Sequence, residues 1–488
     1  MTTSRLTFRG TALTDLLLVN SARRGNVLAS HPFIPGAALR GHLAQRWLRD
    51  RADDERFRHL FESGAVRFHT AHPTAGPEPT LPAPLSRRTC KINPFEPGHF
   101  SDDTLTLDSA PVCTAHGDPA PNEQATATKR VRGVLAPDGV VIDPGQLMVT
   151  RGRIGTVDDA TGSGLAAHQA LFTERRIGAD TAFVFEIDGA AEDLEAIAAL
   201  LDPDGDVVTV GRARSVLGAV EVGAHELQEL PVTPIADDGP ITLTFLSDTV
   251  LVDVWHRSVV ALDDPEVLAR LLTMELDHPV AAESIELYGS AVRATTVGGW
   301  DGRDRWHKPI EPAIAAGSAI RFTCTDRAAL SLLAARSALG WRTAEGFGRI
   351  AIDHWTHNVA LRGQPSMATD TGRDGRRDRI AQVAAAHART LADTHAVSRS
   401  LWQGIEETVR SGLPLRLPHV DDDRHPQSDS GRSAQAGWEQ RRARRKAIEA
   451  FNGACSHLKI APGSTDRIHL ADDIGRELDL LTAPEKDR

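Results

Sequence analysis

The chain has few cysteines, few aromatic residues and no excess of basic charge. Its 488 residues include four cysteines, and aromatic side chains make up 5% of the total. Four cysteines in a chain of this length do not make a disulfide framework, which is consistent with a reducing compartment. The formal net charge of −11 excludes a protein that coats nucleic acid indiscriminately, because such proteins have an overall basic balance. Any contact with nucleic acid therefore has to come from local clusters of arginine.

Long apolar runs are missing as well. No segment of the sequence is long enough to span a bilayer, and no uninterrupted apolar signal stretch follows the first residues. We therefore expect a cytoplasmic protein without membrane contact. Hydrophobic residues make up 41% and charged residues 25%, which is the composition of a globular protein. The length exceeds what one hydrophobic core supports, so two or three domains are expected.

The same order of elements occurs twice along the chain. Each copy contains a strand, a helix, a loop with glycine and arginine, and a final strand; the first lies within residues 182–222 and the second within 319–352. In the second copy, the apolar pattern predicts a helix over residues 327–339. Opening strands are predicted at residues 6–10 and 241–246. The repetition indicates an internal duplication.

We predict an α+β fold with two domains, residues 1–235 and 236–360, followed by a helical C-terminal extension over residues 361–488. Residues 65–165 are rich in proline, glycine and short polar clusters, and they predict a long insertion in the first domain. A structureless loop of that length is uncommon in a compact domain. We therefore expect something to hold the insertion in place, and a metal ion is one candidate.

The two loops combine the residue types that suit phosphate binding. Glycine lets backbone amides approach a phosphate closely, and arginine adds a planar fork that matches phosphate geometry. A dinucleotide fingerprint needs a strand before its glycines and a helix after them, whereas here a helix precedes and a strand follows. The alternative is a tight turn whose arginines are solvated. The loop residues predicted to bind RNA are Gly211, Arg212, Arg214, Gly340, Arg342, Gly346, Gly348 and Arg349.

A helix with apolar residues at four-residue spacing is predicted to begin near residue 35, because proline is favoured at a helix start. Its first turn contains Gly36 and Arg40, and the preceding loop contains Arg23 and Arg24. A helix start beside these arginines would offer a positive dipole and guanidinium groups to an RNA backbone. An ordinary helix start with exposed arginines has the same spacing, so both interpretations stay open.

A candidate metal site lies in the insertion. Cys90, His99, Cys113 and His116 supply two thiolates and two imidazoles, a set suited to tetrahedral structural zinc. Cys113 and His116 are separated by two residues, which lets neighbouring ligands share one ion. The chain has 20 histidines, so a chance arrangement is the alternative. A zinc knuckle would explain how an irregular insertion stays ordered.

Several of these segments resemble a known family. Ile34–Gly41 resembles the first-helix signature of the RAMP superfamily of CRISPR-associated proteins, and Gly340–Arg349 resembles its terminal glycine-rich loop. Gly211–Gly218 is similar to a looser copy of that loop, with Val216-Leu217 where a Gly-aromatic-Gly run is common. The resemblance covers roughly residues 5–355. Three further stretches are similar to the large RAMP subunit of type III-D complexes: residues 170–172, 297–300 and 315–318.

The resemblance implies two RRM-like ferredoxin folds in tandem, assembly with other type III Cas subunits, and gripping of the CRISPR guide RNA near its 5′ repeat-derived tag. Target RNA would be contacted indirectly. Relatives with the insertion carry a cysteine-rich knuckle there, and the histidines depart from it. Trp300, Trp306, Trp341 and Phe347 lie near the predicted RNA loops, where they either stack on bases or fill core. The low aromatic content favours gripping of the RNA backbone over base reading.

We therefore predict a non-catalytic subunit that binds guide RNA. Some RAMP relatives cleave RNA with a histidine near the first helix, so His31 and His42 are the candidates for the alternative, a guide-processing endoribonuclease. Histidines that pack or are solvated are more common than catalytic ones. A second alternative is a protein-bridging subunit without direct RNA contact.

Overall fold

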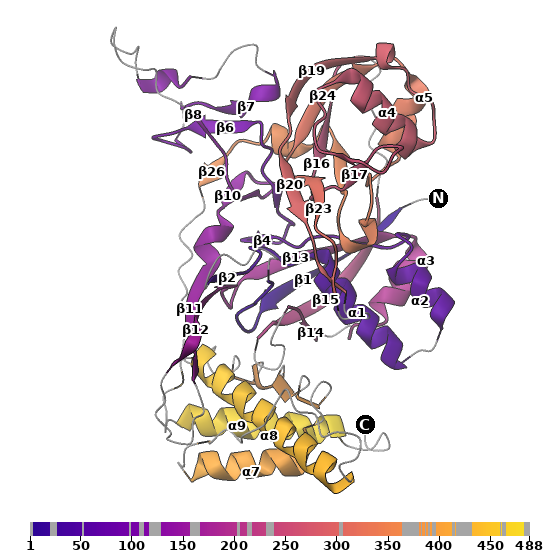
Figure 1. Cartoon of the computed structure of the whole chain (residues 1–488). Helices are drawn as coiled ribbons and strands as arrows, with labels where there is room; N and C mark the ends of the chain where they lie inside the picture. Colours follow the sequence, from indigo (N-terminus) through magenta and orange to yellow (C-terminus); the bar gives the residue numbers. More distant parts are fainter. Residues whose placement is uncertain are drawn as a thin grey trace.

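The computed structural model of the chain is an α+β protein with several sheets (Figure 1). The predicted RNA-binding residues Arg23, Arg24, Arg212 and Arg214 lie outside the residues that the structure describes. The described residues are 3–19, 27–50, 53–96, 99–106, 112–116, 128–156, 166–202, 205–211, 217–230, 239–301, 306–363, 380–381, 383–385, 387–388, 391–392, 397–411, 415, 432–458, 460 and 465–482.

The first sheet is antiparallel, and its central strand comes from the start of the chain. Its order is β14-β15-β1-β13-β3, and β4 also pairs with β13. Leu6 and Phe8 of β1 are buried on one face, while Arg9 is exposed on the other, as the two-residue period of a strand requires. The strands are β1 (Ser4–Ala12), β3 (Arg67–Phe68), β4 (Pro73–Thr74), β13 (Ala182–Gly189), β14 (Asp206–Thr209) and β15 (Ala219–Glu229).

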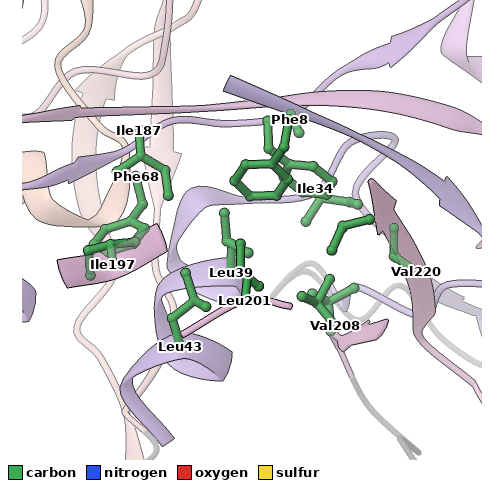
Figure 2. Close-up of a cluster of buried hydrophobic side chains, with 14 of the residues drawn as sticks. Phe8, Ile34, Leu39, Leu43, Phe68, Ile187, Ile197, Leu201, Val208 and Val220 are labelled. Carbon is green, nitrogen blue, oxygen red and sulfur yellow. The ribbon is translucent and has the colours of Figure 1, made fainter. Parts of the chain in front are cut away.

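Helices α1 (Gly36–Asp50), α2 (Asp54–Phe61) and α3 (Ala191–Ala198) bury their apolar sides against this sheet. Helix α1 begins next to Pro35, as predicted. Its residues at four-residue spacing are buried: Leu39, Leu43 and Trp47 are 1%, 0% and 3% exposed. Figure 2 shows Leu39 and Leu43 in the same core as Phe8.

The second sheet repeats this plan with four strands in the order β19-β24-β16-β25. Helices α4 (Pro265–Leu276) and α5 (Arg327–Ala334) share its hydrophobic core. Helix α5 is shorter than predicted, because Ala338 and Leu339 already pair with Arg349 and Gly348 at the end of the glycine loop. The strands are β16 (Ile241–Phe245), β19 (Ile285–Ala291), β24 (Ala319–Cys324) and β25 (Ile350–Ile352).

Residues 65–165, the predicted insertion, contain strands of two to four residues and the longer β11. The first two, β3 and β4, pair with β13 of the first sheet. Strands β7-β6-β8 form a sheet of their own, β5, β9 and β10 share a sheet with β26, and β11 pairs with β12, which pairs with β2. The strands are β2 (Val27–Ala29), β5 (Leu81–Pro82), β6 (Arg87–Cys90), β7 (Ser101–Asp103), β8 (Thr128–Arg130), β9 (Val134–Leu135), β10 (Val140–Ile142), β11 (Met148–Thr156), β12 (Ala166–Ile177) and β26 (Arg362–Gly363).

Helices α7 (Arg399–Arg410), α8 (Arg432–His457) and α9 (Thr465–Thr482) lie where the sequence predicts a helical extension. Figure 1 shows them at the opposite end of the molecule from the second sheet. Their core includes Leu13, which directly follows β1, and Ala219, the first residue of β15. The helices are therefore packed onto the first sheet. No helix among the described residues combines the length and hydropathy of a membrane span.

Candidate RNA interface and candidate metal centre

The last glycine loop, residues 340–349, packs tightly against protein. Gly346 and Gly348 have positive φ angles of 92° and 79°, a conformation that glycine adopts without steric strain. A Cβ atom on Gly346 would collide with the carbonyl oxygen of Phe68, and one on Gly348 with that of Leu339. Phe68 lies in β3 of the first sheet. Close packing against the protein backbone is therefore enough to explain why these positions are glycine, without a bound phosphate.

The first-helix motif meets the last loop at the same place. Gly36 is buried, and a Cβ atom there would also collide with the carbonyl oxygen of Phe68. The carbonyl oxygen of Glu345 lies on the same side of Gly36. Two motifs about 300 positions apart in the sequence thus close around one residue of β3. Arg40 donates to the carbonyl of Phe61 within the first core.

Arg342 is held by two carboxylates. Its guanidinium donates to Glu345 at 2.9 and 3.1 Å, to Glu311 at 2.7 Å and to the carbonyl of Gly298 at 2.9 Å. The same group lies 4.8 Å from the centroid of the Phe347 ring. Burial alone would lower the pKa of Arg342, but the carboxylates raise it above its ordinary value. The arginine is therefore charged and already paired inside the protein.

Arg349 joins the two sheets. Its side chain is buried, and Nη1 lies 2.7 Å from Glu186 in β13 of the first sheet. Glu186 also accepts from Arg5 at 2.7 Å. Burial alone would raise the pKa of Glu186, but the two guanidinium groups lower it to about 2. These contacts favour a structural role for Arg349, and its contact with RNA stays a prediction.

The other glycine loop, residues 211–218, packs in the same way at its two ends, which are the parts that the structure describes. Gly211 and Gly218 have φ angles of 80° and 83°. A Cβ atom on Gly211 would crowd the carbonyl oxygen of Leu17, and one on Gly218 would collide with that of Val210. The glycines at both ends of this loop are therefore placed by close contacts with the protein backbone.

The two histidine candidates have ordinary structural environments. Burial lowers the pKa of His31 to about 4, so its ring is neutral near pH 7, and it lies 4.9 Å from the ring of Phe33. Nδ1 of His42 accepts a hydrogen bond from the backbone amide of Thr209 at 3.2 Å. Cleavage of RNA by either residue remains an untested expectation.

Four tryptophans are exposed on segments that adjoin the last glycine loop. Trp255, Trp300, Trp306 and Trp341 are 74%, 56%, 59% and 47% exposed. They come from the turn between β17 and β18, the β21–β22 hairpin and the glycine loop itself. The strands of this region are β17 (Leu251–Val252), β18 (Ser258–Val259), β20 (Ala294–Val297), β21 (Trp300–Asp301), β22 (Trp306–His307) and β23 (Glu311–Ile314).

Hydrogen bonds tie these segments together. The amide of Trp341 donates to the carbonyl of Val250 at 2.9 Å, and Arg342 reaches Gly298 just before the hairpin. The sequence singled out three of the four tryptophans by their position near the loops. It gave no signal for Trp255, because the turn that brings this residue to the loop is a tertiary feature.

The four predicted metal ligands lie together in the insertion. Their ligand atoms, from Cys90, His99, Cys113 and His116, all lie within 4.8 Å of one another. Sγ of Cys90 lies 3.1 Å from Nε2 of His116, and Sγ of Cys113 lies 3.6 Å from Nδ1 of His99. Both cysteines are buried.

The Cys113 thiol is suited to ligation. Burial alone would raise its pKa, but hydrogen bonds from the amides of Phe100 and Ala115 and from His99 lower it to about 7. A thiolate is the form that binds metal. Two thiolates and two imidazoles at this spacing fit a tetrahedral zinc ion. The set can therefore hold a metal ion, as the sequence predicts.

A comparison with protein families finds a match over slightly less than half of the chain. Residues 131–355 match the family described as CRISPR-associated protein (Cas_Cmr3). This part of the chain is similar to that family, in line with the resemblance drawn from the sequence motifs. The matched part contains the second sheet, all four exposed tryptophans and the last glycine loop. The metal ligands and helices α7 to α9 lie outside it. No curated protein matches the chain.

Several solved structures have a weak likeness to the chain. A chain of the type III-B Cmr-beta complex bound to cognate target RNA and AMPPnP is 13% identical, with a TM-score of 0.33, and the match covers 65% of this chain and 86% of that one. A Cas6-related protein from Pyrococcus furiosus is 10% identical, with a TM-score of 0.31, and the match covers 72% and 98%. A structure described as an RAMP protein binding different RNA substrates has the same identity and TM-score and is covered completely.

Proposed function

We propose that this chain is a protein of the RAMP superfamily and acts as a non-catalytic, RNA-binding structural subunit of a type III CRISPR effector complex. In this role it grips the guide RNA near the 5′ repeat-derived tag and contacts neighbouring Cas subunits. The match to a CRISPR-associated family supports the setting. The single observation that carries RNA binding is the group of four exposed tryptophans around the last glycine loop.

Exposed indole rings at several neighbouring positions favour stacking on bases. The chain has eight tryptophans, and half of them are exposed here, whereas Trp47, Trp402 and Trp438 are buried. Base stacking on an aromatic ring contributes about 1–3 kcal/mol per base in single-stranded RNA and tolerates any sequence. Because Arg342 and Arg349 are paired with glutamates, stacking replaces phosphate gripping as the favoured means of contact at this loop.

The order of elements supports the predicted fold in more detail. In a βαββαβ unit the strands lie in the order fourth, first, third, second. The four main strands of each sheet have this order, β15-β1-β13-β3 in the first and β25-β16-β24-β19 in the second. We therefore propose two ferredoxin-like domains in tandem, residues 1–235 with the insertion and residues 236–360, followed by the helical extension. The cytoplasm is the proposed location.

The Cys and His cluster is proposed to hold structural zinc. Its four ligands come from segments on both sides of β7, so one ion would tie together an insertion whose strands are short. Zinc supplies folding energy at such a site. This part of the proposal is independent of RNA binding.

RNA binding is tested with Trp255→Ala and Trp306→Ala, singly and combined, in the full chain. The readout is the Kd for a short labelled single-stranded RNA that carries a repeat-derived 5′ tag. Each substitution that removes a stacked base is expected to raise the Kd about 5- to 150-fold. Both side chains are exposed, so unfolding curves should stay close to that of the unchanged chain.

Tyr288→Ala is the matched control, because this side chain is aromatic and 52% exposed on β19. It should leave the Kd unchanged. If the double variant binds RNA as tightly as the control, the tryptophans are not an RNA surface. Accumulation of a discrete cleavage product that is lost in His31→Ala or His42→Ala would instead establish the endoribonuclease alternative.

A further inference from the structure

Helix α8 carries a dense run of positive charge on a chain whose net charge is negative. Five of the six residues from position 441 to 446 are basic. The apolar side of the helix is occupied: Ala447, Ile448 and Phe451 are fully buried in the helical core. At 100° per residue, Arg442, Arg445 and Lys446 lie on the opposite side. Arg441 and Arg444 lie closer to the apolar side but are exposed. The basic residues of this run are Arg441, Arg442, Arg444, Arg445 and Lys446.

The charge of this run is only partly neutralised. Arg445 and Lys446 both contact Glu449, each at 3.0 Å. Arg441, Arg442 and Arg444 are exposed and form no ion pair with any residue that the structure describes. The guanidinium of Arg442 lies 5.1 Å from the centroid of the Trp438 ring, which restrains its position.

The spacing of these residues places like charges beside one another. Residues 441 and 445, and residues 442 and 446, are four apart and therefore neighbours on the helix surface. Each like-charge pair of this kind destabilises a helix. A polyanion lying along the helix would relieve that repulsion. Arginine forks suit phosphate oxygens, which accept two parallel hydrogen bonds.

We propose that the exposed basic face of α8, residues 441–446, binds the phosphate backbone of single-stranded RNA. This contact is separate from the four exposed tryptophans. Helix α8 lies at the opposite end of the molecule from the second sheet (Figure 1), whereas the tryptophans lie on β21, β22, the turn between β17 and β18, and the last glycine loop. The bundle is packed onto Leu13 and Ala219 of the first domain, so the basic face has a fixed position relative to the sheets. The inference rests on the proposed RNA-binding function and adds a second, sequence-independent contact.

The test replaces Arg441, Arg442 and Arg444 by glutamine together in the full chain. Binding of a short oligouridylate is measured across a salt titration, because each phosphate contact in single-stranded RNA contributes about 0.7 to the slope of log K against log salt. Losing three contacts should lower the slope by about 2. On counterion release alone, the affinity at about 0.1 M salt should fall roughly 100-fold.

The control makes the same change in net charge on exposed arginines of other helices: Arg58→Gln, Arg270→Gln and Arg327→Gln combined. It should leave the slope within about one contact of the unchanged chain. Thermal unfolding of both triple variants checks that the fold is intact. An equal slope in the test and control variants overturns the inference.

Other outcomes separate this inference from the proposed function. If the unchanged chain binds no RNA, the proposed function fails, and this inference fails with it. If the unchanged chain binds RNA with a salt-dependent slope and the α8 variant matches it, only this inference fails. Normal RNA binding with loss of assembly onto an acidic Cas subunit would assign the basic face to a protein partner and overturn the inference as well.

Discussion

Replacing Arg349 by glutamine is expected to weaken the junction between the two sheets. Glu186 in β13 lies between two guanidinium groups, with Arg5 of β1 and Arg349 of the last loop each at 2.7 Å. All three side chains are wholly or largely buried. Arg349 comes from the loop that leads into the second sheet, so its replacement removes an ion pair between that loop and the first sheet.

The magnitude follows from the carboxylate. The pKa of Glu186 falls from 4.5 to about 2 in the folded chain, which corresponds to about 3 kcal/mol in favour of the ionised form. Removing one partner of a buried ion pair costs about 3–5 kcal/mol. Because Arg5 remains beside the carboxylate, the expected loss for Arg349→Gln lies near the lower end, about 3 kcal/mol.

Urea unfolding near pH 7 measures this loss, and a double-mutant cycle with Glu186→Gln measures the coupling. The two single losses should not add, since each variant removes the same pair. The lowered pKa means that the contribution of Glu186 is complete above pH 4.5 and is lost as the pH falls through about 2. The stability difference between Glu186→Gln and the unchanged chain should therefore shrink below pH 4.5.

Arg270→Gln provides the control, because Arg270 pairs with Glu266 on the surface, where both side chains are more than half exposed. Such a pair contributes about 0–1 kcal/mol. If Arg349→Gln unfolds like this control and yet binds RNA much more weakly, Arg349 contacts phosphate and the structural assignment is wrong.

Three further outcomes are expected. The full chain should bind about one zinc ion at a four-ligand site, and Cys113→Ser should lose it and unfold at lower urea; equal zinc content in both would exclude the site. Gly36→Ala and Gly41→Ala form a matched pair on α1. The first should destabilise the chain by several kcal/mol, because the added Cβ collides with the carbonyl oxygen of Phe68. The second should stabilise it by about 0.5–1 kcal/mol, because the added Cβ meets no other atom. Similar unfolding curves for both would contradict the packing. Burial lowers the pKa of His72 to about 4, so its contribution to the free energy of unfolding is lost as the pH falls from 6.5 towards 4. In His72→Phe, the free energy of unfolding should therefore fall about 2 kcal/mol less between pH 7 and pH 5 than in the unchanged chain. An equal fall in both would show that His72 does not titrate in this range.

The elements with a strong local pattern were predictable from the sequence. The strand predicted at residues 241–246 is β16 (Ile241–Phe245), and α1 begins beside Pro35. Burial of every fourth residue is a property of the helix itself, so it needs no knowledge of distant contacts. That Cys90, His99, Cys113 and His116 lie together was also predictable, because two cysteines and two histidines within one irregular segment suit a shared metal ion.

The contacts of the loop arginines were not predictable. Arg349 and Glu186 are 163 positions apart, and only the packing of one sheet against the other brings them together. A sequence shows that an arginine lies beside glycine, but it does not show whether a carboxylate distant in the sequence already forms an ion pair with that arginine. The exposure of Trp255 and the neutralisation of Arg342 depend on tertiary contacts in the same way.

Phe68 gives the glycine motifs a physical basis that sequence alone does not supply. Gly36 begins the first helix and Gly346 lies in the last loop, yet both present a bare Cα to the carbonyl oxygen of this one residue in β3. A side chain at either position would push the helix start or the loop away from the first sheet. The loop is therefore anchored from one side by close backbone packing and by the ion pair of Arg349. An anchored loop holds Trp341 and the neighbouring hairpins in fixed positions, which would lower the ordering cost of the proposed stacking on RNA.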